Sequence, residues 1–426
     1  MESDRDPLIF RGIFMNDMGS VPLFPPPQPV PPPPLPASSV RIEFSGQRRE
    51  FRGLVERGAA LELITFGFYR FWLATDIRRH LWSHTSVDGD APEYTGRGRE
   101  LLVGFLFAMA ILVPIYVAYF LIGIEAERLK AFASFPLFLF FYLFGQFAIY
   151  RARRYRLTRT VWRGVRFWMD GSGWAYAVRA AGWGLLTTLS LGIMLPWREA
   201  ALERYKMRHC YYGSLEGRFE GRGSQLFKRG WKLWLAALSP FILGIVLSVA
   251  VAGHKSSAFG GIAGLAMVIW FITLPFIYGG FKAIEWNWWI SGVRFGEVSF
   301  ESDLSGHALY GLYWKVIGWF VIIALLFIAY LVTCSFWAFG FNDLDKFAGR
   351  LLASKVMMGA VALGYLATIL AVNVVLRIYL LRDVWARAAA STTVSRLDAA
   401  ANVVAQGELA DAVGEGLGGG LDVVGF

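Results

Sequence analysis

Six apolar runs along the chain are long enough to cross a bilayer, which takes a helix of about 20 mostly apolar residues. They form three pairs, with shorter connectors inside each pair and long polar intervals between pairs. The pattern therefore predicts three transmembrane helical hairpins. The six runs are Leu101–Gly123, Ala131–Tyr150, Trp231–Gly253, Ser257–Phe281, Leu312–Phe336 and Ser354–Leu380.

Two further apolar runs are ambiguous. Ala59–Trp72 is short and carries Glu62 and Arg70, whereas Trp174–Trp197 is longer but rich in glycine and carries Arg179. Charged side chains are costly inside a bilayer. Each run is either a short re-entrant or interfacial helix, which leaves about six spans, or a full span, which gives eight.

Basic residues gather in the polar intervals that flank these runs. Interval 74–100 holds four arginines, interval 151–173 holds seven, and interval 198–230 holds eight arginines and lysines. Basic loops tend to stay on the cytoplasmic side. All three intervals share that side only if the ambiguous runs do not span. The charge pattern thus favours six spans, with both termini in the cytoplasm.

A tandem internal repeat is visible at a shift of 125 residues. Thr65–Leu101 aligns with Ser190–Leu226 without a gap, and 8 of the 37 positions are identical, mostly glycine, arginine and tryptophan. A second echo is the string GVRF, at Gly164–Phe167 and Gly292–Phe295. Internal repeats are common in membrane transporters.

The polar blocks beside the spans contain turn-forming residues between alternating apolar positions. "SVDGDAPEYTG", "SLEGRFEGRG" and "SGVRFGEVSFESD" all have this character, which favours short hairpins. The expected fold class is therefore an all-α polytopic membrane protein with small β-like cytoplasmic loops.

The same pattern divides the chain into five stretches. Residues 1–43 contain a proline-rich segment typical of a disordered or polyproline II tail. Residues 44–173 and 174–311 are the expected first and second membrane units. Residues 312–385 are expected to form a C-terminal helical hairpin, and residues 386–426 a cytoplasmic tail.

Composition agrees with a membrane location. The chain is 56% hydrophobic and 17% charged, with a mean hydropathy of +0.45, whereas soluble domains are usually about a quarter charged. The net charge of +10 is better explained by membrane topology, with an attraction to anionic lipid headgroups, than by nucleic-acid binding. The two cysteines do not indicate a disulfide scaffold.

Two sets of charged residues are candidates for function. Glu62 and Arg179 are possible intramembrane ionisable sites, although Glu62 could instead face water or pair with a nearby arginine. The second set could contact lipid phosphates, because two Gly-Arg-Gly turns can present backbone N–H groups beside matching arginines. It comprises Arg79, Arg97, Arg204 and Arg222.

No pattern points to catalysis or to a bound cofactor. His80 and His84 are four residues apart, but Tyr205 replaces His80 in the second copy and no carboxylate or cysteine cluster completes a metal site. No nucleophile triad, phosphate-binding loop or dinucleotide fingerprint is present. We therefore expect no catalytic, metal-binding or cofactor-binding residues, and we expect that the protein is not an enzyme.

Several of these motifs resemble one known family. They are the two ambiguous apolar runs, which contain glycine and end in tryptophan, the F/Y-x-G-x-G turns at Tyr94 and Phe219, "YRLTRTVWRGVRF" (Tyr155–Phe167) and "AQGELADAVGEGLG" (Ala405–Gly418). Together they resemble the YjgN family of bacterial inner-membrane proteins over roughly residues 44–420. The resemblance implies a multi-pass protein of the bacterial inner membrane and implies no reaction. The first ambiguous run departs from the family pattern, because it has Arg70-Phe71 where the second run has Leu195-Pro196.

Two functional hypotheses remain open from the residues. The paired spans, the repeat and the two glycine-containing ambiguous runs are compatible with a transporter or channel-like protein of unknown substrate. The basic aromatic blocks and the nearly non-polar spans favour a non-catalytic scaffold or a protein that binds anionic lipids. The lipid bilayer is the expected partner, and the oligomeric state stays open.

Overall fold

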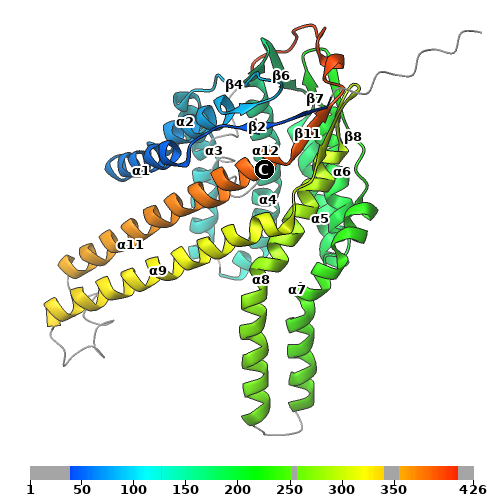
Figure 1. The fold of residues 1–426 in the computed structure, drawn as a ribbon. Helices are drawn as coiled ribbons and strands as arrows, with labels where there is room; N and C mark the ends of the chain where they lie inside the picture. Colours follow the sequence, from blue (N-terminus) through cyan, green and yellow to red (C-terminus); the bar gives the residue numbers. More distant parts are fainter. Residues whose placement is uncertain (1–38, 126, 252–256, 340–354, 411–426) are drawn as a thin grey trace, which may run out of the picture. The chain divides into compact units, whose positions relative to one another are not determined.

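The computed structural model describes residues 39–125, 127–251, 257–339 and 355–410 (Figure 1). The proline-rich part of the expected N-terminal tail lies outside these residues, as do the end of the C-terminal motif, after Ala410, and parts of the connectors inside the three pairs. The described chain is mostly helical, and its three pairs of long helices are separated by short helices and strands.

The long helices contact one another in sequential pairs. α3 contacts α4, α7 contacts α8 and α9 contacts α11, and Figure 1 shows α7 and α8 side by side. α11 continues through a π-helical segment, η2 (Arg377–Asp383), into α12 (Val384–Ala390). The long helices are α3 (Gly98–Glu125), α4 (Glu127–Thr158), α7 (Gly223–Val251), α8 (Ser257–Gly292), α9 (Gly306–Phe339) and α11 (Lys355–Leu376).

Five helices in the described part are long and apolar enough to cross a membrane. Each overlaps one expected run, and the remaining run, Trp231–Gly253, coincides with α7. The chain therefore has the helices of a membrane protein, and the count of six spans stays a prediction. The five are Gly98–Leu121, Phe135–Thr158, Val268–Gly292, Gly306–Cys334 and Lys355–Ala390.

Each ambiguous run is divided by a turn into two helices. The first short hairpin is α1 (Arg48–Ile64) and α2 (Arg70–Ser83), and the second short hairpin is α5 (Gly173–Leu189) and α6 (Leu195–Arg208). The helices of each hairpin contact one another, and all four boundaries recur at a shift of 125 residues. Neither run is one continuous helix.

The two turns are built in the same way. Phe66 and Gly67 have positive φ in the first, and Leu191 and Gly192 have positive φ in the second. The Gly67 N–H donates to the Glu62 carbonyl and the Gly192 N–H to the Thr187 carbonyl, both at 2.7 Å. Glycine suits this left-handed backbone because it has no Cβ.

The polar blocks form one nine-stranded antiparallel sheet, in the order β1-β11-β10-β9-β8-β7-β6-β5-β4, with β2 and β3 paired separately. The expectation of small β-like loops in an all-α protein is therefore wrong in extent. Isolated short hairpins are only marginally stable, whereas here each strand pairs with strands from the neighbouring blocks. The strands are β1 (Ser39–Arg41), β2 (Glu43–Phe44), β3 (Thr85–Ser86), β4 (Glu93–Tyr94), β5 (Thr160–Trp162), β6 (Val165–Met169), β7 (Cys210–Tyr212), β8 (Leu215–Phe219), β9 (Val293–Phe295), β10 (Val298–Ser302) and β11 (Thr392–Ser395).

The sheet joins the start of the described chain to its end. Val40 of β1 pairs with Val394 of β11, which also pairs with Phe300 of β10. Residues from the expected terminal tails thus belong to the sheet, and Val394 lies in an apolar cluster with Trp162 and Tyr212. This packing places residues far apart in sequence around the same interior.

The two GVRF strings occupy different structural positions. Gly164 lies in the β5–β6 turn with φ +76°, whereas Gly292 ends α8 immediately before β9. The turn that corresponds to Gly164 contains Gly296 instead, with φ +56°. The string therefore does not mark equivalent residues of a repeat.

Candidate functional site

The arginine and glycine residues shared by the two short hairpins form a structural clamp. Arg79 donates to the Gly96 carbonyl at 2.7 Å, and Arg204 donates to the Gly221 carbonyl at 3.4 Å. This contact joins α2 to the start of α3 and α6 to the start of α7. Two of the four residues proposed for lipid phosphates therefore bind backbone carbonyls.

Two glycines let these helices approach closely. A Cβ on Gly98 would lie 2.8 Å from the Trp72 Cα, and a Cβ on Gly223 would lie 2.7 Å from the Trp197 Cα. The other two phosphate candidates, Arg97 and Arg222, are exposed beside these glycines. Their contact with lipid stays a prediction.

Glu62 and Arg179, the two candidate ionisable sites, are in different surroundings. The Glu62 carboxylate accepts two hydrogen bonds from Arg377, at 2.9 and 3.2 Å, and its side chain is only 9% exposed. Arg179 is exposed, donates to the Ala175 carbonyl and lies over the Tyr205 ring at 4.5 Å. Glu62 therefore has the paired arrangement that was one of its two interpretations.

The second short hairpin contributes a buried carboxylate of its own. Glu203 on α6 pairs with Arg153 of α4 at 2.8 Å and with Lys206, and its side chain is 7% exposed. Burial alone would raise the pKa of Glu203, but Arg153 and Lys206 outweigh burial and lower the pKa to about 2. Each short hairpin thus pairs one carboxylate with an arginine from a long helix or its extension.

Arg153 and Arg377 both line a central cavity of about 590 Å³. Arg78 from α2 and Arg156 from α4 complete its four cations, and no aspartate or glutamate is among the described residues that line it. Glu203 and Glu62 therefore lie behind the arginines they bind, outside the wall of the cavity.

The rest of the central cavity is mainly apolar and aromatic. Trp82 and Trp385 stack with their ring centroids 5.1 Å apart, and their indole N–H groups donate to Thr160 and Thr85. The central cavity is lined by Ile42, Ala74, Ile77, Arg78, Leu81, Trp82, Thr85, Arg153, Arg156, Leu157, Thr160, Phe167, Trp286, Trp289, Ile290, Phe300, Arg377, Leu381, Trp385, Ala388, Ala389 and Thr392.

A smaller cavity of about 170 Å³ adjoins the central cavity and shares Arg153, Trp286, Trp289 and Ala388 with it. Its charged groups come from α4, α6 and α8. Lys282 pairs with Glu285 at 2.7 Å. Burial raises the pKa of Glu199 in the same cavity. The charged lining residues are Arg153, Glu199, Glu203, Lys206, Lys282 and Glu285.

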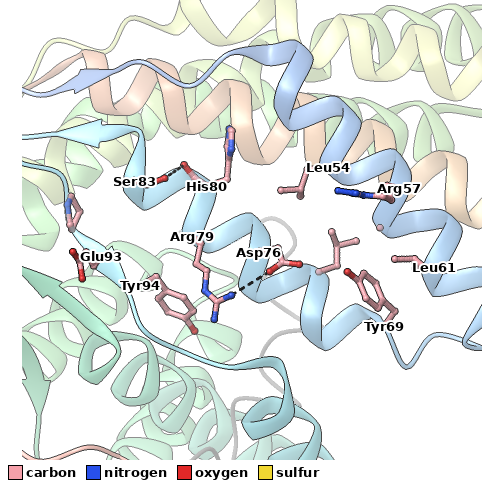
Figure 2. A pocket seen from close by; sticks show the side chains of 13 residues that line it. Leu54, Arg57, Leu61, Tyr69, Asp76, Arg79, His80, Ser83, Glu93 and Tyr94 are labelled. Atoms are coloured by element: carbon pink, nitrogen blue, oxygen red, sulfur yellow. Dashed lines mark hydrogen bonds and ion pairs between the residues drawn. The ribbon is translucent and has the colours of Figure 1, made fainter.

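A third cavity, of about 770 Å³, lies between α1, α2 and β4, and we call it the hairpin groove (Figure 2). Figure 2 shows Arg57, Leu61 and Tyr69 toward one end and Glu93 at the other. Asp76 and Arg79 lie between these ends, 3.6 Å apart. The groove is lined by Leu54, Arg57, Gly58, Leu61, Tyr69, Leu73, Asp76, Arg79, His80, Ser83, Pro92, Glu93 and Tyr94.

Two histidines at the end of α2 contact each other with tilted rings. The ring centroids of His80 and His84 are 4.2 Å apart, and His84 Nδ1 is 2.7 Å from the His80 carbonyl oxygen. Among residues 39–125, 127–251, 257–339 and 355–410, no group of three or more His, Cys, Asp or Glu residues is placed to bind a metal ion.

Sequence reasoning missed the arginines of the central cavity. Arg153 and Arg156 counted only toward topology, and Arg377 lies inside the expected span Ser354–Leu380. A cation inside an apolar run needs a partner of opposite charge. Arg377 lies in one apolar run and the Glu62 carboxylate in another, so the two could have been expected to pair. That complementarity was the signal that could have linked the two segments.

Comparison with known proteins identifies a family for this chain. A family described as "Bacterial protein of unknown function (DUF898)" matches residues 39–419. Neither the curated proteins nor the solved structures gave a match. The matched region includes every described residue that lines the three cavities.

Proposed function

Because the chain belongs to DUF898, the YjgN-like family of bacterial proteins of unknown function, we propose that it is a multi-pass inner-membrane protein that binds an anionic amphiphile. Such a ligand has a negatively charged head and a hydrocarbon body. The proposed site is the central cavity, and the proposed role is binding without catalysis.

The observation that carries the proposal is the composition of the central cavity. Of the residues that the structure describes, four arginines and no carboxylate line it, and the rest of the wall is largely aromatic and aliphatic. Guanidinium groups match phosphate and carboxylate oxygens in geometry and charge. A volume of about 590 Å³ lies within the usual range of ligand pockets. An anionic head and an apolar body would satisfy both parts of the wall.

The cavity also lies at the ends of candidate spans. Arg153 and Arg156 are near the C-terminal end of Phe135–Thr158, and Trp289 is near that of Val268–Gly292. Arginine and tryptophan are typical of the membrane interface. A lipid headgroup at this level would reach the arginines without crossing the hydrocarbon core.

The same proposal includes the topology. We place six spans across the membrane, with the sheet and both termini in the cytoplasm. The short hairpins then enter the membrane and return, because their turns expose apolar side chains. Phe66 is 91% exposed and Leu191 is 87% exposed, and lipid is the environment that makes such exposure favourable.

Transport of the same ligand is the second candidate. It is favoured by Arg153, which lines both the central and the smaller cavity, and by the buried charged network next to it. Ionisable groups at membrane depth often mark a substrate or proton pathway. Protein-dependent flux of a fluorescent anionic amphiphile into proteoliposomes would favour transport over binding alone.

Lipid retention by Arg78→Gln/Arg156→Gln tests the binding site. Charge-assisted contacts contribute about 1.5–3 kcal/mol each, so we expect phosphatidylglycerol retention to fall at least about tenfold. Native mass spectrometry of the purified full chain would measure it. Arg52→Gln is the matched control, because Arg52 pairs with Glu56 at the protein surface. Unchanged phosphatidylglycerol retention in the double variant would contradict the proposal.

A further inference from the structure

The hairpin groove is an opening that the second short hairpin has filled. At a shift of 125 residues, Gly58 corresponds to Trp183 and His80 corresponds to Tyr205. Trp183 and Tyr205 pack in an apolar cluster with Tyr150. The two hairpins share their helix boundaries, so the groove results from side-chain differences on one common framework.

Its charges also differ from those of the second hairpin. The groove has two carboxylates, Asp76 and Glu93, where the second hairpin has Ala201 and Arg218. It also has two cations, Arg57 and Arg79. Equal numbers of acidic and basic groups fit a ligand that carries both charges, in contrast to the all-cationic central cavity.

The two ends of the groove have groups ready for such a ligand. Within the described residues, the Arg57 guanidinium and the Glu93 carboxylate form no hydrogen bond or ion pair, and both side chains are exposed. Figure 2 shows them at opposite ends. Between them, Asp76 and Arg79 approach only to 3.6 Å, too far for a well-formed hydrogen bond.

The order of these groups along the hairpin matches a particular headgroup. The apolar turn with exposed Phe66 comes first, then Arg57 near Leu61 and Tyr69, then Asp76, and finally Glu93 on β4. A phospholipid with a primary amine has the same order of hydrocarbon, phosphate and ammonium. The phosphate would meet Arg57, and the ammonium would meet Asp76, because a two-carbon chain joins these groups and Asp76 is the nearer of the two carboxylates.

We propose that the hairpin groove binds the phosphate and ammonium groups of an aminophospholipid such as phosphatidylethanolamine. This site is separate from the central cavity and does not depend on the function proposed for that cavity. The ammonium has three N–H donors for carboxylate acceptors, whereas the trimethylammonium of phosphatidylcholine has none. The groove should therefore discriminate between these two zwitterionic lipids.

Lipid retention in the full chain tests this site. The protein would be purified into nanodiscs of phosphatidylethanolamine, phosphatidylcholine and phosphatidylglycerol in equal parts, and its co-purifying lipids would be measured. We expect about tenfold preference for phosphatidylethanolamine over phosphatidylcholine, lost in Asp76→Asn/Glu93→Gln. Arg57→Gln should lower retention of both zwitterionic lipids, because each carries the phosphate. Glu301→Gln, at an exposed glutamate on β10, is the matched control.

Two results would overturn the inference. One is equal retention of phosphatidylethanolamine and phosphatidylcholine by the unmodified chain. The other is an unchanged preference in the Asp76→Asn/Glu93→Gln variant. Phosphatidylglycerol retention reports on the central cavity in the same experiment, so failure of one site is distinguishable from failure of the other.

Discussion

The two short hairpins have the same backbone plan but different interiors. α1–α2 and α5–α6 have equivalent boundaries, turns of the same hydrogen bonding, and an arginine clamped onto a carbonyl at the next helix. The first hairpin lines an open groove. In the second hairpin, the side chains of Trp183 and Tyr205 fill the equivalent space. The framework depends on a few positions where the backbone allows little choice, and the remaining positions have diverged.

The divergence also affects the charges around the central cavity. Arg78 on α2 and Glu203 on α6 occupy equivalent positions. Arg78 lines the cavity itself, whereas Glu203 pairs with Arg153, which lines it. In the same way, Glu62 on α1 pairs with Arg377, which also lines the cavity. Among the described residues, only the first hairpin therefore places side chains in the cavity wall, whereas each hairpin places one carboxylate behind an arginine of that wall.

The largest expected effect comes from removing a buried carboxylate. Glu203→Ala leaves Arg153 buried without its carboxylate partner, which should cost about 3–5 kcal/mol of stability. Glu62→Ala should have a similar cost through Arg377. Thermal unfolding of the purified protein would measure both. A cost near zero for either variant would show that its ion pair is not formed in the membrane-extracted protein.

Glu203 also predicts a dependence on pH. Its pKa is about 2 in the folded protein, below the usual value near 4.3 in an unfolded chain. Its contribution to stability is therefore present above the unfolded pKa and is lost as the pH falls toward about 2. When the pH is lowered over this range, the Glu203→Gln variant should lose less stability than the unmodified chain does. Parallel acid unfolding curves would contradict this prediction.

Substitution of the close-contact glycines should have the next largest effect. Gly98→Val and Gly223→Val place side-chain atoms against the backbones of Trp72 and Trp197. We expect each to cost about 1–3 kcal/mol, because overpacking forces the backbone to shift. Unfolding midpoints would measure the loss. Effects of very different size would show that the two junctions are not equivalent.

The smallest expected effect lies in the two turns. Gly67→Ala and Gly192→Ala force alanine into a left-handed backbone, at a cost of about 1–2 kcal/mol. A Cβ at Gly67 meets nothing within 4 Å, but at Gly192 it would lie 3.0 Å from Trp234. Gly192→Ala should therefore be the more destabilising of the pair, as measured by thermal unfolding. A larger loss for Gly67→Ala would contradict this order.

The sequence allowed the helices to be predicted but not the cavity. Long apolar runs have a strong signal, and the positive-φ turns are marked by Gly67 and Gly192. The sheet was underestimated because its strands have two to five residues and pair with strands from separate blocks. Side chains from Ile42 to Thr392 line the central cavity, and no local pattern connects residues so far apart.

Photo-crosslinking with a diazirine-bearing anionic phospholipid tests the central claim most directly. The full chain in native-like membranes would be labelled, digested and mapped by mass spectrometry. Occupancy of the central cavity predicts labelling at its wall, in residues 74–85, 153–160, 286–290 and 381–389, with loss of this labelling in Arg78→Gln/Arg156→Gln. Labelling confined to the lipid-facing sides of the spans, such as residues 321–328 of α9, and equal in both proteins, would contradict the claim.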